Sequence, residues 1–283
     1  MAKRTVATLL DMKRDGKKIS QLTCYDYSMA CLMKEADVDT ILVGDSLGMT
    51  MQGYDTTLPV SMDEMIVYGR SVVRGATEQF VIMDMPFMSY QVSVEQAVTN
   101  AGRLIKETGA NAVKLEGGAA VTAQIKAIVD SGIPVCAHIG MTPQSVNVFG
   151  GFKVQGKGEV NAERVLQDAF AVQEAGAFMV VLECVPPKLA ALITKKLDII
   201  TIGIGAGSEC DGQVLVWQDM AGISRNVKPK FARHFAEIGE ALVNAFKLYD
   251  EEVKNSNFPA PEHTYAKSDC GDEFLDGLDK KYN

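Results

Sequence analysis

Residues 178–183 read Phe-Met-Val-Val-Leu-Glu, a short apolar run that ends in a carboxylate. Runs of this kind, apolar on both faces, are typical of strands in a parallel sheet that helices cover. Similar runs recur along the chain, each followed by a helical pattern. The predicted strands are Ile19–Cys24, Thr40–Gly44, Phe80–Met83, Ala112–Leu115, Pro134–Ala137, Phe178–Leu182, Ile199–Ile204 and Val214–Trp217.

The segments between these strands carry the signals of helix ends. Ser61 with Glu64, and Ser93 with Gln96, have the spacing of a capping box. The second box opens an apolar stripe at helical spacing that closes at a glycine. We expect further helices near 119–131 and 161–175, and a last amphipathic helix, about Phe231–Val253, that completes the ring.

This alternation predicts an α/β protein that folds as a single (β/α)₈ TIM barrel. A doubly wound open parallel sheet shows the same alternation and stays open as an alternative. The length of 283 residues suits one barrel. We expect residues 1–265 to form the catalytic barrel domain, and residues 266–283, which are polar and acidic, to form a flexible tail.

Composition excludes several classes of protein. The net charge of −8 argues against a nucleic-acid partner, because a phosphate backbone requires a basic face. The six cysteines form no C-x-x-C pair, and most lie in apolar runs, as is typical of reduced proteins. The N-terminus lacks the apolar stretch of a signal peptide, and no window reaches about 18 apolar residues. We therefore expect a cytoplasmic protein that has no membrane partner.

Polar side chains stand at the ends of five successive predicted strands. They are Asp45 and Ser46, then Asp84, then Lys114 and Glu116, then His138, and finally Glu183. A barrel brings the carboxyl ends of its strands into one ring, so we expect these side chains to meet there. Two long loops, 47–60 and 141–158, follow strand ends where barrel active-site loops occur.

Asp45 and Asp84 stand at adjacent strand ends, with Glu116 on the next strand. Together they supply the oxygen ligands that Mg²⁺ takes, with substrate and water completing the octahedron. Aspartate also caps helices well, and position alone does not decide between these roles.

Glu183 and His138 are the candidates for proton transfer. Glu183 follows an apolar strand across the barrel from the aspartates and is a candidate general base. The alternative is a structural ion pair between Glu183 and Lys114. His138 is either a core histidine or part of the site. By contrast, the glycines of GIGAG at 203–207 lack the helix start of a dinucleotide motif.

Longer blocks of sequence make the chain recognisable. They are VGDSLGMTMQGYDTTLPV (43–60), DMPFMSY (84–90), GANAVKLEGG (109–118), GIPVCAHIGMTPQSVNVFGGFKVQGK (132–157), LECVP (182–186) and IGIGAGSECDGQVLVWQDM (202–220). In this order, from about Thr23 to Tyr265, the chain resembles the ketopantoate hydroxymethyltransferase family. The resemblance implies a (β/α)₈ barrel that moves a hydroxymethyl group from 5,10-methylenetetrahydrofolate to 3-methyl-2-oxobutanoate. The product is 2-dehydropantoate, in pantothenate biosynthesis, formed through an enolate that Mg²⁺ stabilises.

The resemblance also assigns roles to single residues. The implied metal ligands are Asp45 and Asp84, and Glu116 either binds the ion directly or orients the groups that bind it. The implied substrate contacts are Asp45, Ser46, Asp84, Lys114 and His138. The implied proton-abstracting residue is Glu183. It further implies a homo-oligomer, commonly a decamer. The runner-up is a Mg²⁺-dependent C–C lyase or mutase of the phosphoenolpyruvate mutase and isocitrate lyase type, which needs no folate.

Overall fold

In the computed structural model, which describes residues 3–224, 229–265 and 270–282, the strands form a closed parallel barrel. Each strand pairs with the next along the chain, and β8 pairs with β1. The strands are β1 (Ile19–Thr23), β2 (Thr40–Val43), β3 (Phe80–Asp84), β4 (Ala112–Glu116), β5 (Val135–Gly140), β6 (Met179–Glu183), β7 (Ile200–Ile204) and β8 (Gly212–Leu215). Closure confirms the predicted (β/α)₈ barrel and excludes the open sheet.

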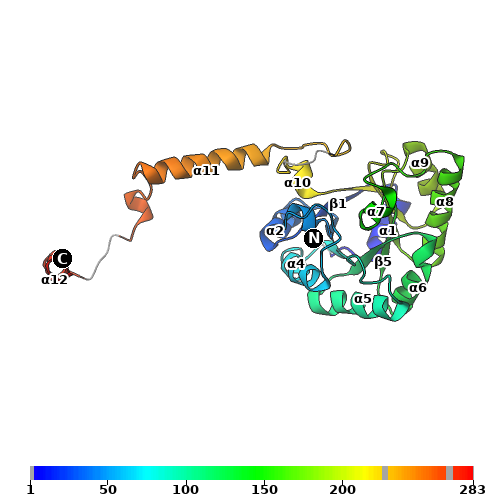
Figure 1. Ribbon diagram of the computed structural model, residues 1–283, viewed down its shortest axis with the longest axis horizontal. Helices are drawn as coiled ribbons and strands as arrows, with labels where there is room; N and C mark the ends of the chain where they lie inside the picture. Colours follow the sequence, from blue (N-terminus) through cyan, green and yellow to red (C-terminus); the bar gives the residue numbers. More distant parts are fainter. Residues whose placement is uncertain (1–2, 225–228, 266–269, 283) are drawn as a thin grey trace.

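Helices connect the strands and surround most of the barrel (Figure 1). They are α1 (Val6–Arg14), α2 (Tyr27–Glu35), α3 (Leu47–Thr50), α4 (Met62–Gly75), α5 (Val94–Thr108), α6 (Thr122–Asp130), α7 (Val146–Phe149), α8 (Glu159–Glu174), α9 (Pro187–Lys196), α10 (Trp217–Met220), α11 (Ile238–Lys254) and α12 (Asp272–Tyr282), with 3₁₀ turns at Ala119–Val121, Pro143–Ser145 and Pro261–His263. The predicted capping box starts α4: Ser61 and Glu64 each accept the other's backbone N–H. Ser93 likewise caps α5.

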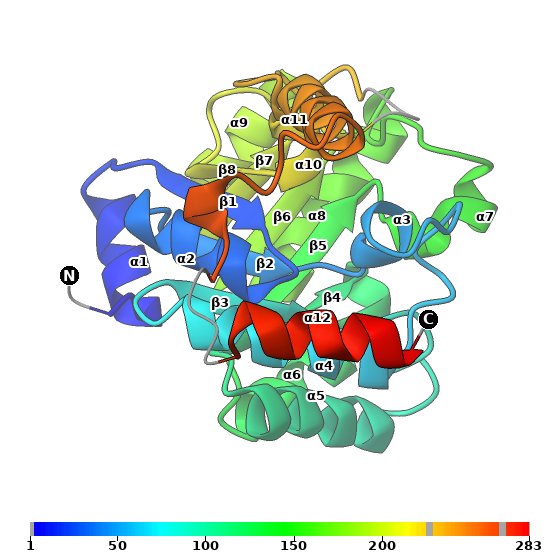
Figure 2. The same cartoon turned by 90° about the vertical axis from the view of Figure 1, so that its left-hand side faces the viewer.

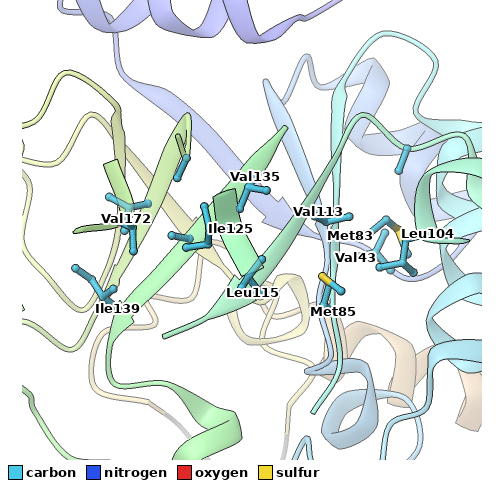
Figure 3. Close-up of a cluster of buried hydrophobic side chains, with 14 of the residues drawn as sticks. Val43, Met83, Met85, Leu104, Val113, Leu115, Ile125, Val135, Ile139 and Val172 are labelled. Carbon is cyan, nitrogen blue, oxygen red and sulfur yellow. The ribbon is translucent and has the colours of Figure 1, made fainter. Parts of the chain in front are cut away.

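Alternation along the strands divides the core into two layers. Inward residues such as Ile82 and Val181 fill the barrel, and Leu9 of α1 closes that cluster. Outward residues such as Val113 and Leu115 pack against the helices, as Figure 3 shows. Apolar packing therefore fills the lower barrel and leaves the carboxyl ends of the strands for polar groups.

The eighth strand was predicted at Val214–Trp217 but begins at Gly212, and Trp217 instead starts α10. The backbone of Gly212 passes so close to β1 that a Cβ there would lie 2.3 Å from the carbonyl oxygen of Ile19. In the sequence a glycine suggests a turn, which is why the strand was predicted to begin after it. Here the glycine instead allows close pairing of two strands.

The last helix was predicted to complete the ring, and this is wrong. Helix α11 begins at Ile238 and extends away from the barrel; Figure 1 shows it from the side and Figure 2 looks along it. Within the predicted tail, Asp272–Tyr282 forms α12, while residues 266–269 and 283 lie outside the described residues. None of the described helices is long and apolar enough to cross a membrane.

Candidate active site at the carboxyl ends of the strands

The polar strand ends continue the inward-facing rows of the barrel. Asp84 follows Ile82 at the alternate position of β3, so its side chain also points inward. Strand pairing then aligns Asp84 with Lys114, and Glu116 with His138. Register alone therefore brings together residues that are far apart in the sequence.

Lys114 lies at the centre of this group. Its ammonium forms an ion pair with Asp84 and lies 3.8 Å from Oε1 of Glu116, and the three side chains are at most 5% exposed. Burial acts to lower the pKa of Lys114, but the surrounding carboxylates, Asp84 foremost, outweigh burial and raise it. Lys114 is therefore a fixed positive charge.

Asp45 is held by a residue that the sequence did not single out. The side-chain Nε2 of Gln144 donates to Oδ2 of Asp45 at 2.8 Å and to the Met85 carbonyl at 2.9 Å. The backbone N–H of Gln144 donates to Oε2 of Glu116 at 2.9 Å. Gln144 thus connects a carboxylate that follows β2 with a carboxylate at the end of β4.

Tyr90 holds the side chain of Gln144 in place by a hydrogen bond. Its hydroxyl donates to Oε1 of Gln144 at 2.7 Å and accepts the backbone N–H of Glu116 at 3.1 Å, and its side chain is buried. Gln144 and Tyr90 both belong to blocks that carry the family resemblance. Neither carries a charge, so neither has the side-chain chemistry that marks a metal ligand or a general base in a sequence.

His138 lies between two carboxylates. Its Nδ1 is 3.3 Å from Oε1 of Glu116, and its Nε2 is 3.3 Å from Oε2 of Glu183. Burial and the charge of Lys114 act to lower the pKa of His138, but the carboxylates on either side outweigh them and raise it to about 9. The ring is therefore an imidazolium at neutral pH.

The structure connects six of the seven predicted site residues in one set of contacts. Asp84, Lys114, Glu116, His138 and Glu183 are linked directly, and Asp45 joins them through its backbone N–H to Asp84 at 3.1 Å and through Gln144. Ser46 follows Asp45, but its hydroxyl hydrogen-bonds the Tyr25 hydroxyl at 2.8 Å. The structural ion pair between Glu183 and Lys114, the alternative role for Glu183, is not formed among the described residues. Glu183 instead faces His138.

The side chains of this group carry more negative than positive charge, which favours the binding of a metal cation. Four carboxylates face one ammonium and one imidazolium, which leaves a deficit of two positive charges when all are ionised. Burial first, and then neighbouring carboxylates, raise the pKa of Asp45 well above its ordinary value. Burial also raises the pKa of Asp84, although Lys114 opposes the shift. The cationic side chains of the group therefore do not fully balance its carboxylates.

No three His, Cys, Asp or Glu side chains among the described residues stand together as a ready metal cage. Lys114 engages Asp84 and Gln144 engages Asp45. The donor chemistry nevertheless fits Mg²⁺, which takes one or two carboxylates and completes its shell with substrate and water. The two missing positive charges equal the charge of one such ion.

Comparison with known sequences identifies relatives across the chain. The family described as "Ketopantoate hydroxymethyltransferase" matches residues 3–261. A Clostridium novyi (strain NT) protein named 3-methyl-2-oxobutanoate hydroxymethyltransferase is 58% identical over 93% of this chain and 96% of its own. A protein of the same name from Syntrophus aciditrophicus (strain SB) is 54% identical, covering 93% and 97%.

Comparison with solved structures shows the fold. Phosphonopyruvate hydrolase matches with a TM-score of 0.60 at 12% identity, covering 100% of this chain and 99% of that one. The lyase acting on 2,3-dimethylmalate, described as a PEP mutase/isocitrate lyase superfamily member, matches with a TM-score of 0.58 at 15% identity, covering 98% and 95%. Phosphonopyruvate hydrolase has also been solved with oxalate and Mg²⁺.

Proposed function

The chain belongs to the ketopantoate hydroxymethyltransferase family, and on that basis we propose that it transfers a hydroxymethyl group to 3-methyl-2-oxobutanoate in pantothenate biosynthesis. The one-carbon donor is 5,10-methylenetetrahydrofolate and the product is 2-dehydropantoate. One observation carries the mechanism: a carboxylate, Glu183, stands at the more open side of a buried carboxylate–lysine group. Its side chain is 13% exposed, against 3% for Asp84 and Glu116.

Asp45 and Asp84 would hold Mg²⁺, and Glu116 would bind the ion or orient its ligands. When bound, the ion supplies Lewis acidity that stabilises negative charge on the ketone oxygen of the substrate. Gln144 supports this assignment, because it donates to Oδ2 of Asp45, and among the described residues no hydrogen bond reaches Oδ1.

The substrate carries a carboxylate beside a ketone, and both need positive partners. Lys114 and His138 are the two cations of the site and would donate hydrogen bonds to these oxygens. Ser46 would donate to the carboxylate after breaking its contact with Tyr25. These contacts orient C3 of the substrate toward Glu183.

Glu183 would remove the C3 proton as a general base. The electron pair of the broken C–H bond then forms the new C–C bond to the one-carbon unit of the folate, and the C–N electron pairs return to the folate nitrogens. Water supplies the hydroxyl group of the product. The remaining proton of that water and the proton held by Glu183 pass to the folate nitrogens, which releases tetrahydrofolate. His138 holds the Glu183 carboxylate from one side, which fixes its position for this transfer. Fixed charges that need not reorganise are the usual source of such stabilisation.

We also propose a cytoplasmic homo-oligomer that takes small-molecule substrates. Support for the compartment comes from five cysteines that form no disulfide within the part of the chain that the structure describes: Cys24, Cys31, Cys136, Cys184 and Cys210.

The test is product identification by mass spectrometry after mixing the protein with the oxo acid, methylenetetrahydrofolate and Mg²⁺. We expect 2-dehydropantoate only when all three are present, and its loss with EDTA. Turnover of the oxo acid without folate would instead favour the C–C lyase or mutase class.

A further inference from the structure

The mouth of the barrel, at the carboxyl ends of its strands, has a charged half and an uncharged half. The charged side chains described above stand at the ends of the strands from β2 to β6. The inward positions at the ends of β7, β8 and β1 belong to Ile204, Val216 and Thr23. Ile204 packs against the interior cluster, and Val216 continues the inward row of Val214. Neighbouring strands lie about 4.8 Å apart, so this half extends across about 10 Å, wide enough for a bicyclic ring.

Solvent reaches the mouth over β6, β7 and β8. Asp84 and His138 are each 2% exposed, whereas Glu183, Ile204 and Val216 are partly exposed. The strand ends of the charged half are thus covered, and those of the uncharged half are more open. A second substrate that enters this mouth therefore passes over the uncharged half.

Glu183 stands at the border between the two halves. Strand register pairs it with Ile204 on β7, while its carboxylate faces His138 of β5 on the other side. In the proposed reaction, the one-carbon unit must reach the carbon from which Glu183 takes the proton. The oxo acid occupies the charged side of Glu183 in that reaction, so the folate has to lie on the side of Ile204.

Gln218 of α10 carries a buried amide without a full set of hydrogen bonds. The residue is 4% exposed, and its Oε1 has no hydrogen-bond partner among the described residues. Its Nε2 lies 3.3 Å from Sδ of Met51, a weak acceptor. Because Met51 follows β2 and Gln218 follows β8, this contact lies over the end of β1, in the uncharged half. Buried polar groups normally have partners, so this amide indicates a ligand that supplies them.

The adjacent Trp217 fixes α10 over the same strand. Its backbone N–H donates to Oγ1 of Thr23 at 3.1 Å. Its indole Nε1 is also buried without a hydrogen-bond partner in the described part of the chain. A donor and an acceptor without partners thus occur on consecutive residues at the rim of the uncharged half.

We propose that the uncharged half of the mouth binds the pteridine ring of the folate, with Ile204 and Val216 against the face of the ring and the amide of Gln218 at its edge. The 4-oxo group and the N3–H of a reduced pteridine form an acceptor–donor pair, which a primary amide matches with one donor and one acceptor. Ligand sites commonly combine an apolar wall with a few polar groups that fix orientation. The inference rests on the proposed function and names where its second substrate binds.

Fluorescence measures this binding directly, because Trp217 is the only tryptophan in the sequence. Titration of the full-length protein with tetrahydrofolate, in the presence of Mg²⁺, should quench its emission and saturate. Gln218→Leu should weaken the affinity at least about tenfold, as expected when a buried polar group loses its partner. The control Gln167→Leu, on the exposed side of α8, should leave the affinity unchanged. Equal affinities in Gln218→Leu and the unaltered protein would overturn the placement and show that water satisfies the amide.

Steady-state kinetics separate the two substrates. Val216→Phe fills the space assigned to the ring, so KM for methylenetetrahydrofolate should rise at least about tenfold while KM for the oxo acid changes less than about twofold. An equal rise in both KM values would contradict a separate subsite. If the unaltered protein forms product and both variants keep its KM values, the position of the ring is wrong and the proposed function stands. If the unaltered protein neither binds tetrahydrofolate nor forms product, the proposed function fails, and this inference fails with it.

Discussion

His138 and Glu183 lie on neighbouring strands, with the imidazole Nε2 of the first 3.3 Å from the carboxylate Oε2 of the second. The other ring nitrogen faces Glu116 at the same distance. A histidine with a carboxylate on each side carries its positive charge above the pH at which a free imidazole loses it. This charge stands beside the proposed base and beside the expected substrate oxygens.

His138 should keep its positive charge at neutral pH. The pKa of His138 is raised to about 9, against an ordinary value of about 6.5. A raised pKa stabilises the folded state fully below the ordinary value, and the effect is lost as pH rises through 9. In metal-free protein we expect NMR of labelled histidine to show His138 protonated at pH 7.5. His138→Gln identifies the signal, and a neutral ring at pH 7 would contradict the prediction.

Removing the central ammonium should destabilise the protein. Lys114→Met leaves Asp84 buried without its cation and leaves Glu116 paired with His138 alone, and loss of one partner of a buried pair costs about 3–5 kcal/mol. Urea unfolding in EDTA measures the loss. Lys254→Met is the control, because its ion pair with Asp250 is exposed and contributes little. Equal effects of the two substitutions would show that the buried group is not charged as described.

Gln144 should position the metal ligands rather than react. Gln144→Leu removes the hydrogen bond to Asp45, and loss of an outer partner typically weakens metal binding about 10- to 100-fold. Calorimetric titration of the metal-free protein with Mn²⁺ measures the affinity directly. Gln167→Leu is the matched control and should leave the affinity unchanged, because the exposed Gln167 side chain lies 3.4 Å from Oε1 of Glu163 on α8, outside this group. Unchanged affinity in Gln144→Leu would refute the role.

Gly140 should be required for the position of Glu183. Its φ is +91°, and a Cβ there would lie 2.4 Å from the carbonyl oxygen of Glu183. We expect Gly140→Ala to reduce kcat about 100-fold, as a displacement of about 1 Å in a catalytic group can. Gly132→Ala is the control: its φ is +83° with nothing within 4 Å, so it shares the backbone strain without the clash. Similar kcat values in the two variants would contradict the prediction.

Much of this site could be predicted because strand alternation is strict. Asp84 continues the inward apolar row of β3, and Glu116 follows Lys114 in the inward row of β4, so the sequence alone places them in the barrel mouth. The approximate limits of most strands followed from the same pattern. The pattern also favoured a closed barrel, but it did not exclude an open sheet, because closure depends on β8 pairing with β1 through Gly212, a residue that also suits a turn.

The rest depended on contacts that no local pattern encodes. Gln144 lies in the 3₁₀ turn Pro143–Ser145 after β5, and only the three-dimensional path of that segment brings its amide to Asp45. The amphipathic pattern of α11 predicted a helix correctly but not its partner, because periodicity reports an apolar face and not what covers it.

The most direct test of the central claim is exchange of the substrate C3 proton in D₂O, followed by NMR with Mg²⁺ and without folate. The protein should exchange this proton, and Glu183→Gln, which keeps the shape of the side chain, should slow the exchange at least about 100-fold. Exchange at the unaltered rate in Glu183→Gln would show that another group removes the proton.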